Sequence, residues 1–195
     1  MGLDGGLNMF IDYGKRTIMI KIVYWGGAMS GKTTSVKYIF QKYNFQRALK
    51  SIETTSGRTL FFDFGELIIN RGQWKFQINL WTATGQDFYC ETRPTVLSGV
   101  DGIVFIIDGQ KKLIADNLRS LNELKKLLGP KIDDLPLIFC LNKIDLNEVI
   151  SIKDLKEYIN FHGNFRFFET IATSGYNVID AFEIMIKEIF NAAKK

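Results

Sequence analysis

The chain has 195 residues with a hydrophobic fraction of 46%, which is enough for one globular domain with a sizeable core. Sixteen phenylalanines exclude a disordered chain, and a net charge of +4 without a block of like charge gives no support for nucleic-acid binding. Every apolar run falls well short of the roughly twenty residues of a membrane span. We therefore expect a single domain over residues 1–195, located in the cytoplasm and without a nucleic-acid partner.

The two ends of the chain show no lipidation motif. Gly6 stands where a myristoylated N-terminus needs Ser or Thr, and the sequence ends in Lys194 and Lys195 without a prenylation cysteine. We therefore expect no intrinsic membrane anchor. Residues 1–16 begin with several glycines, and they fit either a flexible tail or a short extra strand around residues 9–13.

In chain order, residues 18–25 are nearly all apolar, several of them β-branched, and predict a buried strand. A glycine-rich loop follows, and apolar residues at helical spacing then predict a helix through residues 36–43. Residues 59–70 predict another strand, and residues 74–80 alternate strictly between apolar and polar side chains. Because only a short turn at residues 71–72 separates these two strands, they must be antiparallel.

Strands and helices alternate through the rest of the chain. Buried strands are predicted at residues 103–107, 137–141 and 167–171, and helices at residues 118–128, 151–160 and 179–189. The sum is an α/β fold with about six strands and about five helices, in which a mostly parallel sheet has one antiparallel edge strand. Helices on both faces of the sheet make three layers.

The loop after the first of these strands has a motif with a defined chemistry. It matches G-x-x-x-x-G-K-[ST] at every fixed position, in residues Gly26, Gly27, Ala28, Met29, Ser30, Gly31, Lys32 and Thr33. Glycine lets backbone N–H groups turn inward around phosphate oxygens, and the N-terminus of the next helix adds positive potential. Lys32 would reach the β- and γ-phosphates, the Thr33 hydroxyl would ligate Mg²⁺, and Thr34 would continue the site. The loop predicts nucleotide binding without selecting the nucleotide.

A second motif, after the strand at residues 137–141, concerns the base. Asn142, Lys143 and Asp145 belong to an Asn-Lys-Ile-Asp sequence, and ligands of open α/β sheets bind at the carboxyl ends of strands. The Asp145 carboxylate can accept hydrogen bonds from N1–H and the 2-amino group of guanine, a pattern that adenine lacks. Asn142 would brace the loop, the Lys143 stem would cover the ring, and the Ala172 N–H could meet the guanine O6. This base selection argues against a P-loop kinase or ATPase.

The phosphate loop, the antiparallel strand pair, Gly85-Gln86, Asn-Lys-Ile-Asp and the Ala172 loop occur in this order along the chain. Together they resemble the Ras-like small GTPases over nearly the whole chain, which implies a P-loop NTPase fold of the Ras-like G-domain type. Two segments resemble the prokaryotic MglA-type gliding-motility GTPases in particular. These are residues 58–64, Arg-Thr-Leu-Phe-Phe-Asp-Phe, and residues 82–86, which begin with Thr where Ras proteins have Asp.

This resemblance implies roles for several residues. Thr59 would sense the γ-phosphate through Mg²⁺, and Gly85 would belong to the nucleotide site. Gln86 would orient the attacking water, and Arg58 would act as an intrinsic arginine finger when an activator binds. Members of the family are GTP/GDP switches in polarity or trafficking, with Mg²⁺ as cofactor. Their partners are effectors and GTPase-activating proteins, including small roadblock-fold proteins.

Three departures from the family pattern leave alternatives open. Ala28 stands where Ras-like loops usually have Gly, and its methyl group would crowd the attacking water, so we expect slow hydrolysis. Thr82 lacks the carboxylate that normally holds Mg²⁺ through water, and Thr54 or Thr55 could replace Thr59 as the metal ligand. The expected function is a GTP/GDP switch with slow, activator-stimulated hydrolysis. The alternative is a GTP-binding scaffold with little hydrolysis.

Overall fold

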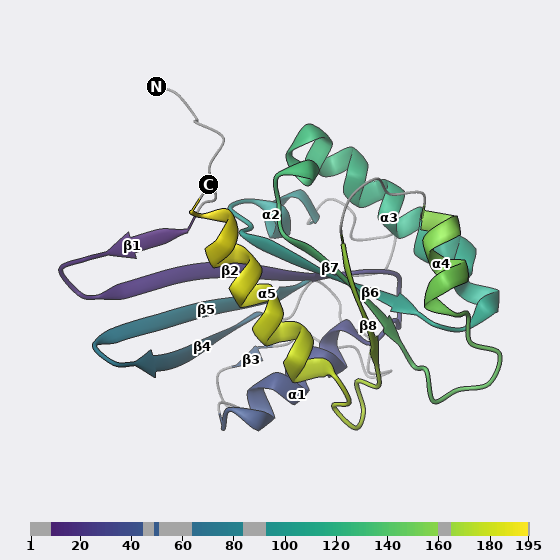
Figure 1. Cartoon of the computed structure of the whole chain (residues 1–195), viewed down its shortest axis with the longest axis horizontal. Helices are drawn as coiled ribbons and strands as arrows, with labels where there is room; N and C mark the ends of the chain where they lie inside the picture. The colour runs from purple at the N-terminus through teal and green to yellow at the C-terminus, as the bar shows by residue number, and fades with distance from the viewer. Residues whose placement is uncertain (1–8, 45–48, 51–63, 84–92, 160–164, 195) are drawn as a thin grey trace.

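Figure 1 shows the computed structural model, which describes residues 9–44, 49–50, 64–83, 93–159 and 165–194. Within these residues, eight strands form one mixed sheet with helices packed against it. The strands are β1 (Phe10–Asp12), β2 (Thr17–Trp25), β3 (Leu49–Lys50), β4 (Phe64–Arg71), β5 (Trp74–Thr82), β6 (Gly102–Asp108), β7 (Leu137–Asn142) and β8 (Arg166–Thr170). The α-helices are α1 (Lys32–Lys42), α2 (Arg93–Leu97), α3 (Ile114–Leu128), α4 (Ile152–Ile159) and α5 (Val178–Ala192), and short 3₁₀ turns occur at η3 (Lys111–Leu113) and η4 (Gly129–Asp133).

The order of strands in the sheet is β3-β4-β5-β2-β6-β7-β8, and β1 pairs with the beginning of β2. The neighbouring pairs from β5 to β8 are parallel, whereas β4 runs antiparallel to β5, with Arg71 opposite Trp74 at their turn. The predicted α/β architecture, a mostly parallel sheet with an antiparallel strand, is therefore confirmed. The structure adds the short antiparallel strand β3 to the six that the sequence predicted, and β1 corresponds to the extra strand that the sequence offered as an alternative around residues 9–13.

The observed parallel strands begin and end within two residues of the predicted ones. The predicted strand at residues 59–70 corresponds to β4, and its first five residues lie outside the described part of the chain. At the start of α4, the Ser151 hydroxyl accepts a hydrogen bond from the Asp154 N–H at 3.1 Å, so Ser151 is the N-terminal cap of this helix. Within the described ranges, no helix combines the length and apolar character that crossing a membrane requires.

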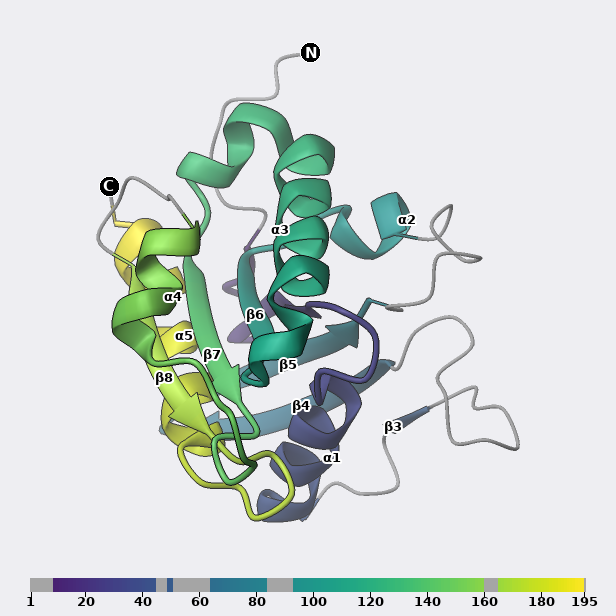
Figure 2. The same cartoon turned by 90° about the vertical axis from the view of Figure 1, so that its right-hand side faces the viewer.

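Apolar side chains alternate along the strands and fill both faces of the sheet. Tyr24 on β2 and Ile106 on β6 belong to the cluster under α1 and α5. Their neighbours Trp25 and Phe105 belong to the cluster under α2, α3 and α4. All seven residues of β6 are buried, as expected for a central parallel strand. The helices thus form one layer on each face, which Figure 2 shows from the side.

The carboxyl ends of three neighbouring parallel strands hold the polar residues of interest. β2 ends at Trp25 and leads into the loop at residues 26–31, β6 ends at Asp108, and β7 ends at Asn142. Because β6 lies between β2 and β7 and all three strands point the same way, these residues meet at one edge of the sheet.

Cys140 lies on β7, in the cluster under α1 and α5. Its side chain is free and buried, and this burial raises the pKa of the thiol to about 12. Burial, together with the nearby Cys140, also raises the pKa of the Tyr24 phenol well above its usual value. Both groups therefore remain neutral inside the core.

We expect Cys140 to contribute to a loss of stability at alkaline pH. The thiol ionises near pH 9 in the unfolded chain but only near pH 12 in the folded one. Its contribution is therefore complete below pH 9 and falls above it, by up to about 1.4 kcal/mol per pH unit. Urea unfolding of Cys140→Ala from about pH 8 to about pH 11 should show a shallower decline than the parent chain. Identical declines in the two proteins would show that this thiol is not responsible.

Candidate functional site

Backbone geometry explains both fixed glycines of the phosphate loop, residues 26–33. Gly26 has φ +145°, and a Cβ atom there would lie 2.1 Å from the carbonyl oxygen of Ile106 on β6. Gly31 has φ +106°, and a Cβ atom there would lie 2.2 Å from Nδ2 of Asn142 on β7. Because any side chain at either position would displace the loop from the edge of the sheet, the loop depends on glycine at both places.

Lys32, the first residue of α1, extends back into this loop. Its side chain is buried, and Nζ donates to the carbonyl oxygens of Gly26 at 3.0 Å and Gly27 at 2.6 Å. The loop therefore wraps around an ammonium group at the N-terminus of a helix, where the helix dipole also favours an anion. Thr33 and Thr34 follow in the first turn of α1, and they are half-buried and exposed, respectively.

The outer part of the loop is open to solvent. Ala28 is exposed, and Met29 is 68% exposed with φ +59°, a left-handed conformation that is unfavourable for so large a side chain. Ser30, by contrast, is fully buried. The sequence motif gives no sign of the conformation at Met29, because it leaves the intervening positions unconstrained.

Asn142 joins three parts of the site through one buried side-chain amide. Its Nδ2 donates to the Ser30 carbonyl at 2.7 Å. Its Oδ1 accepts from the Ala172 N–H at 2.9 Å and from the Thr170 hydroxyl at 3.3 Å. The side chain is only 1% exposed, so these bonds are shielded from water. The phosphate loop, the end of β7 and the loop after β8 are thereby held in one arrangement.

Lys143 and Asp145 follow Asn142 and differ in their surroundings. Lys143 has φ +66°, and its Nζ forms an ion pair of 2.6 Å with the buried carboxylate of Asp108. The other oxygen of that carboxylate accepts from the backbone and side-chain N–H groups of Gln110, both at 3.1 Å. Asp145 is exposed in a turn closed by a hydrogen bond of 3.1 Å from the Leu146 N–H to the Lys143 carbonyl. Its carboxylate is therefore accessible to a ligand.

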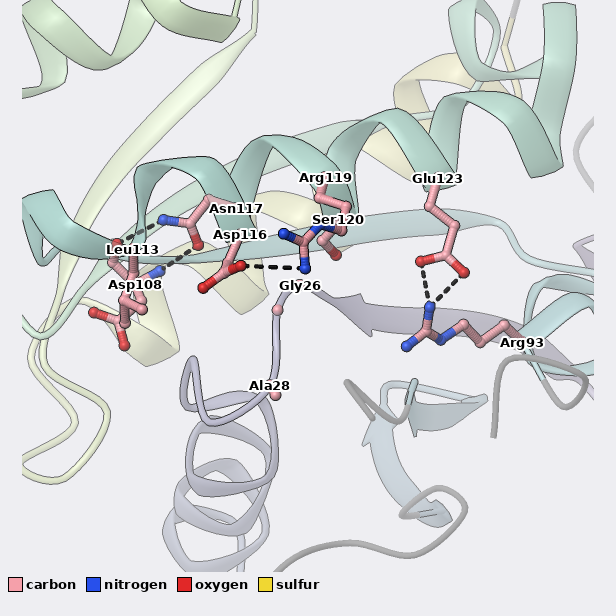
Figure 3. A pocket seen from close by; sticks show the side chains of 11 residues that line it. Gly26, Ala28, Arg93, Asp108, Leu113, Asp116, Asn117, Arg119, Ser120 and Glu123 are labelled. Carbon is pink, nitrogen blue, oxygen red and sulfur yellow. Dashed lines mark hydrogen bonds and ion pairs between the residues drawn. The ribbon is translucent and has the colours of Figure 1, made fainter. Parts of the chain in front are cut away.

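A pocket of about 200 Å³ lies between the phosphate loop and α3, and Figure 3 shows its lining. Gly27 and Ala28 contribute one side of it. Across the pocket, the buried side chain of Arg93 at the start of α2 forms an ion pair with Glu123 on α3. This pair ties α2 to α3 beside the phosphate loop. Asn117 on α3 fixes the end of β6 in the same pocket, because its amide makes two hydrogen bonds to the Asp108 backbone, at 2.8 and 3.1 Å.

Sequence reasoning missed Asp108, Arg93 and Glu123. A carboxylate at the carboxyl end of a buried strand is a recognisable feature at this edge of the sheet, and it could have identified Asp108. Arg93 and Glu123 are thirty residues apart and belong to no motif, so only the fold brings them together.

Several predicted residues fall outside the described part of the chain. They are Arg58, Thr59, Gly85, Gln86 and the alternative metal ligands Thr54 and Thr55. Their roles stay predictions.

Fold and site together define a P-loop nucleotide-binding domain. A glycine-bounded loop that surrounds a buried ammonium group at a helix N-terminus suits the phosphates of a nucleotide. The half-buried hydroxyl of Thr33 is an oxygen ligand of the kind that Mg²⁺ accepts.

Comparison with known proteins identifies the family. The model of the Ras family matches residues 21–191. The chain is 35% identical over 193 residues to the mutual gliding-motility protein MglA of Myxococcus xanthus, across 95% of this chain and 98% of that protein. It is 26% identical over 180 residues to the Ras-related protein Rab7 of Cenchrus ciliaris, across 89% of this chain and 83% of that protein. The chain belongs to the Ras family, and it is a small GTPase that acts as a GTP/GDP switch.

Replacing Asn142 by alanine should destabilise the protein by about 3 kcal/mol, because it leaves the buried Ser30 carbonyl and Ala172 N–H without their partner, at about 1–3 kcal/mol each. Urea unfolding followed by circular dichroism measures the loss. The matched control is Asn70→Ala, an exposed asparagine on β4, which should stay within about 0.5 kcal/mol of the parent. Equal effects of the two substitutions would contradict the bracing role of Asn142.

Proposed function

We propose that this small GTPase binds GTP and GDP with Mg²⁺ where β2, β6 and β7 end, and hydrolyses GTP slowly until an activator raises the rate. The observation behind this proposal is the buried amide of Asn142, which links the phosphate loop to the loop after β8. A nucleotide would therefore meet its phosphate and base contacts at a fixed spacing. We propose that residues 1–195 form a single G domain around this site.

Asp145 is the residue we propose for selecting guanine. Its exposed carboxylate can accept from N1–H and from the 2-amino group of the base. The ammonium of Lys143 is held by Asp108, which leaves its carbon stem to cover the ring. The Ala172 N–H donates to Asn142 at 2.9 Å, so a contact with the guanine O6 would have to share this donor.

The phosphates would lie in the loop of residues 26–33, with Lys32 as their counter-charge. Mg²⁺ would be held by the hydroxyls of Thr33 and Thr59, with Thr54 or Thr55 as alternatives to the latter, and would neutralise charge on the β- and γ-phosphates. Gly85 and Thr34 would complete the surroundings of the phosphates. Thr82, which ends β5, is 1% exposed and supplies no carboxylate to the metal.

For catalysis we propose Gln86, which would orient the attacking water, and Arg58, which would stabilise developing charge when an activator binds. Ala28 is exposed on the phosphate loop, where its methyl group would narrow the space for these groups. Arg93 begins α2, and its ion pair with Glu123 ties α2 to α3. The methyl group at position 28 therefore supports slow hydrolysis in the absence of an activator.

The proposed partners are effector proteins and a GTPase-activating protein, with a roadblock-fold protein as the candidate activator, and the proposed location is the cytoplasm. A GTP-binding scaffold with little hydrolysis is the second candidate. The alanine at position 28 and the missing carboxylate at position 82 favour it.

The substitution Asp145→Asn should change the base preference from guanine to xanthine. The asparagine amide can donate to the 2-oxo group of xanthine, but it cannot accept both guanine protons. We expect GDP binding to weaken at least about 100-fold and xanthosine diphosphate binding to strengthen, because a site built for a hydrogen bond rejects a mismatched partner. Titration with fluorescent analogues of both nucleotides measures this exchange, and an equal loss of both would mean that Asp145 does not contact the base.

Multiple-turnover GTP hydrolysis distinguishes the switch from the scaffold. Unstimulated Ras-type hydrolysis runs at roughly 10⁻⁴ s⁻¹, and an arginine engaged in cis raises it to about 10⁻² s⁻¹. We expect the parent near the slower rate, a further loss of about tenfold or more in Gln86→Leu, and little change in Arg58→Ala without an activator. Arg166→Ala, an exposed arginine on β8, is the control. Rates at or below the slower value that no substitution changes would support the scaffold.

A further inference from the structure

Two turns lie side by side at the end of the sheet opposite the phosphate loop (Figure 1). The first joins β1 to β2 at residues 13–16, and the second joins β4 to β5 at residues 72–73. They are connected by a backbone hydrogen bond of 2.8 Å from the Lys75 N–H to the Arg16 carbonyl, and by a second bond from the Arg16 guanidinium to the Gln73 side chain. The two turns therefore form one surface, which we call the hairpin tip and define as residues 12–17 and 70–75.

The hairpin tip concentrates positive charge. Its basic residues are Lys15, Arg16, Arg71 and Lys75, and its acidic residue is Asp12, so it has a net charge of +3 in a chain whose total is +4. Lys15, Arg16 and Arg71 are exposed, and Lys75 is half-buried. One Asp12 oxygen accepts a hydrogen bond from the Lys15 backbone N–H at 2.8 Å, and the Lys15 side chain is exposed to solvent.

Aromatic rings accompany these cations. Tyr13 is 75% exposed, and its ring contacts that of Trp74 edge-on at 5.9 Å. Phe10, three residues before Tyr13 on β1, is 54% exposed. An exposed tyrosine and a half-buried tryptophan next to lysine and arginine suit the interface of a lipid bilayer, because the rings fit the headgroup level and the cations attract anionic lipids.

We propose that the hairpin tip docks reversibly on an anionic membrane surface. The hairpin tip has only twelve residues, whereas a stable protein interface buries roughly 800 Å² from about 20–30 residues of each partner. A bilayer accommodates a small tip, because single side chains can enter the headgroup layer without a preformed groove. Each basic side chain near an anionic surface strengthens binding about fivefold, so the tip provides a reversible contact and not an anchor.

The test is sedimentation of the full chain with vesicles of phosphatidylcholine alone or with about one quarter phosphatidylglycerol, at low and at raised salt. We expect binding to the anionic vesicles alone, weakened by salt. The double variant Lys15→Glu/Lys75→Glu should reduce it at least about 25-fold, because two fivefold contributions are removed. Tyr13→Ser should reduce it further, and nucleotide binding, measured in parallel, should be unchanged in all variants.

A matched control distinguishes binding through the hairpin tip from a general attraction of the basic protein to anionic vesicles. Lys126→Glu/Lys131→Glu changes the net charge by the same amount at exposed positions on α3 and η4. This variant should keep more than half of the parent's vesicle binding. The proposal is overturned if both double variants lose binding equally, if the parent does not bind anionic vesicles at low salt, or if heparin binds the hairpin tip while vesicles do not.

Discussion

The functional edge of this molecule depends on how the amide of Asn142 packs against the phosphate loop. β6 lies between β2 and β7, so the Asn142 side chain has to reach past the end of β6 to the Ser30 carbonyl. It can do so only because residue 31 has no side chain, since a Cβ atom there would lie 2.2 Å from the amide nitrogen. Glycine in one motif and asparagine in the other are therefore parts of one contact. That contact sets the spacing between the phosphate and base contacts of the proposed site.

The parts of the site that the sequence predicted are those in which a single residue type meets a local requirement. A loop that turns N–H groups toward phosphate needs glycine at fixed places, and Gly26 and Gly31 have the positive φ angles that explain this need. The pairs Lys143–Asp108 and Arg93–Glu123 are different, because each joins residues at least thirty positions apart. Opposite charges at such separations occur throughout any chain, so only the fold determines which of them meet.

The same distinction applies to the fold. The buried strands β6 and β7 and the helices α3 and α5 were predictable, because each repeats its apolar pattern over enough residues to distinguish a period of two from one of 3.6. β1 and β3 have three and two residues, and α2 has five, which is too few for either period to appear. Their positions depend on pairing with β2 and β4 or on packing under the sheet. Such contacts are tertiary and leave no local pattern in the sequence.

The sheet also determines how the hairpin tip and the nucleotide site are oriented relative to each other. β2 begins at the tip and ends at the phosphate loop, and its nine residues separate the two by roughly 26 Å. β5 runs beside it in a continuous parallel register from Thr17 opposite Lys75 to Tyr24 opposite Thr82. Two paired strands in the centre of a sheet resist bending, so a molecule held by its tip would direct the nucleotide site away from the membrane. Nucleotides could then enter and leave the site while the tip contacts the membrane, because the two lie at opposite ends of β2.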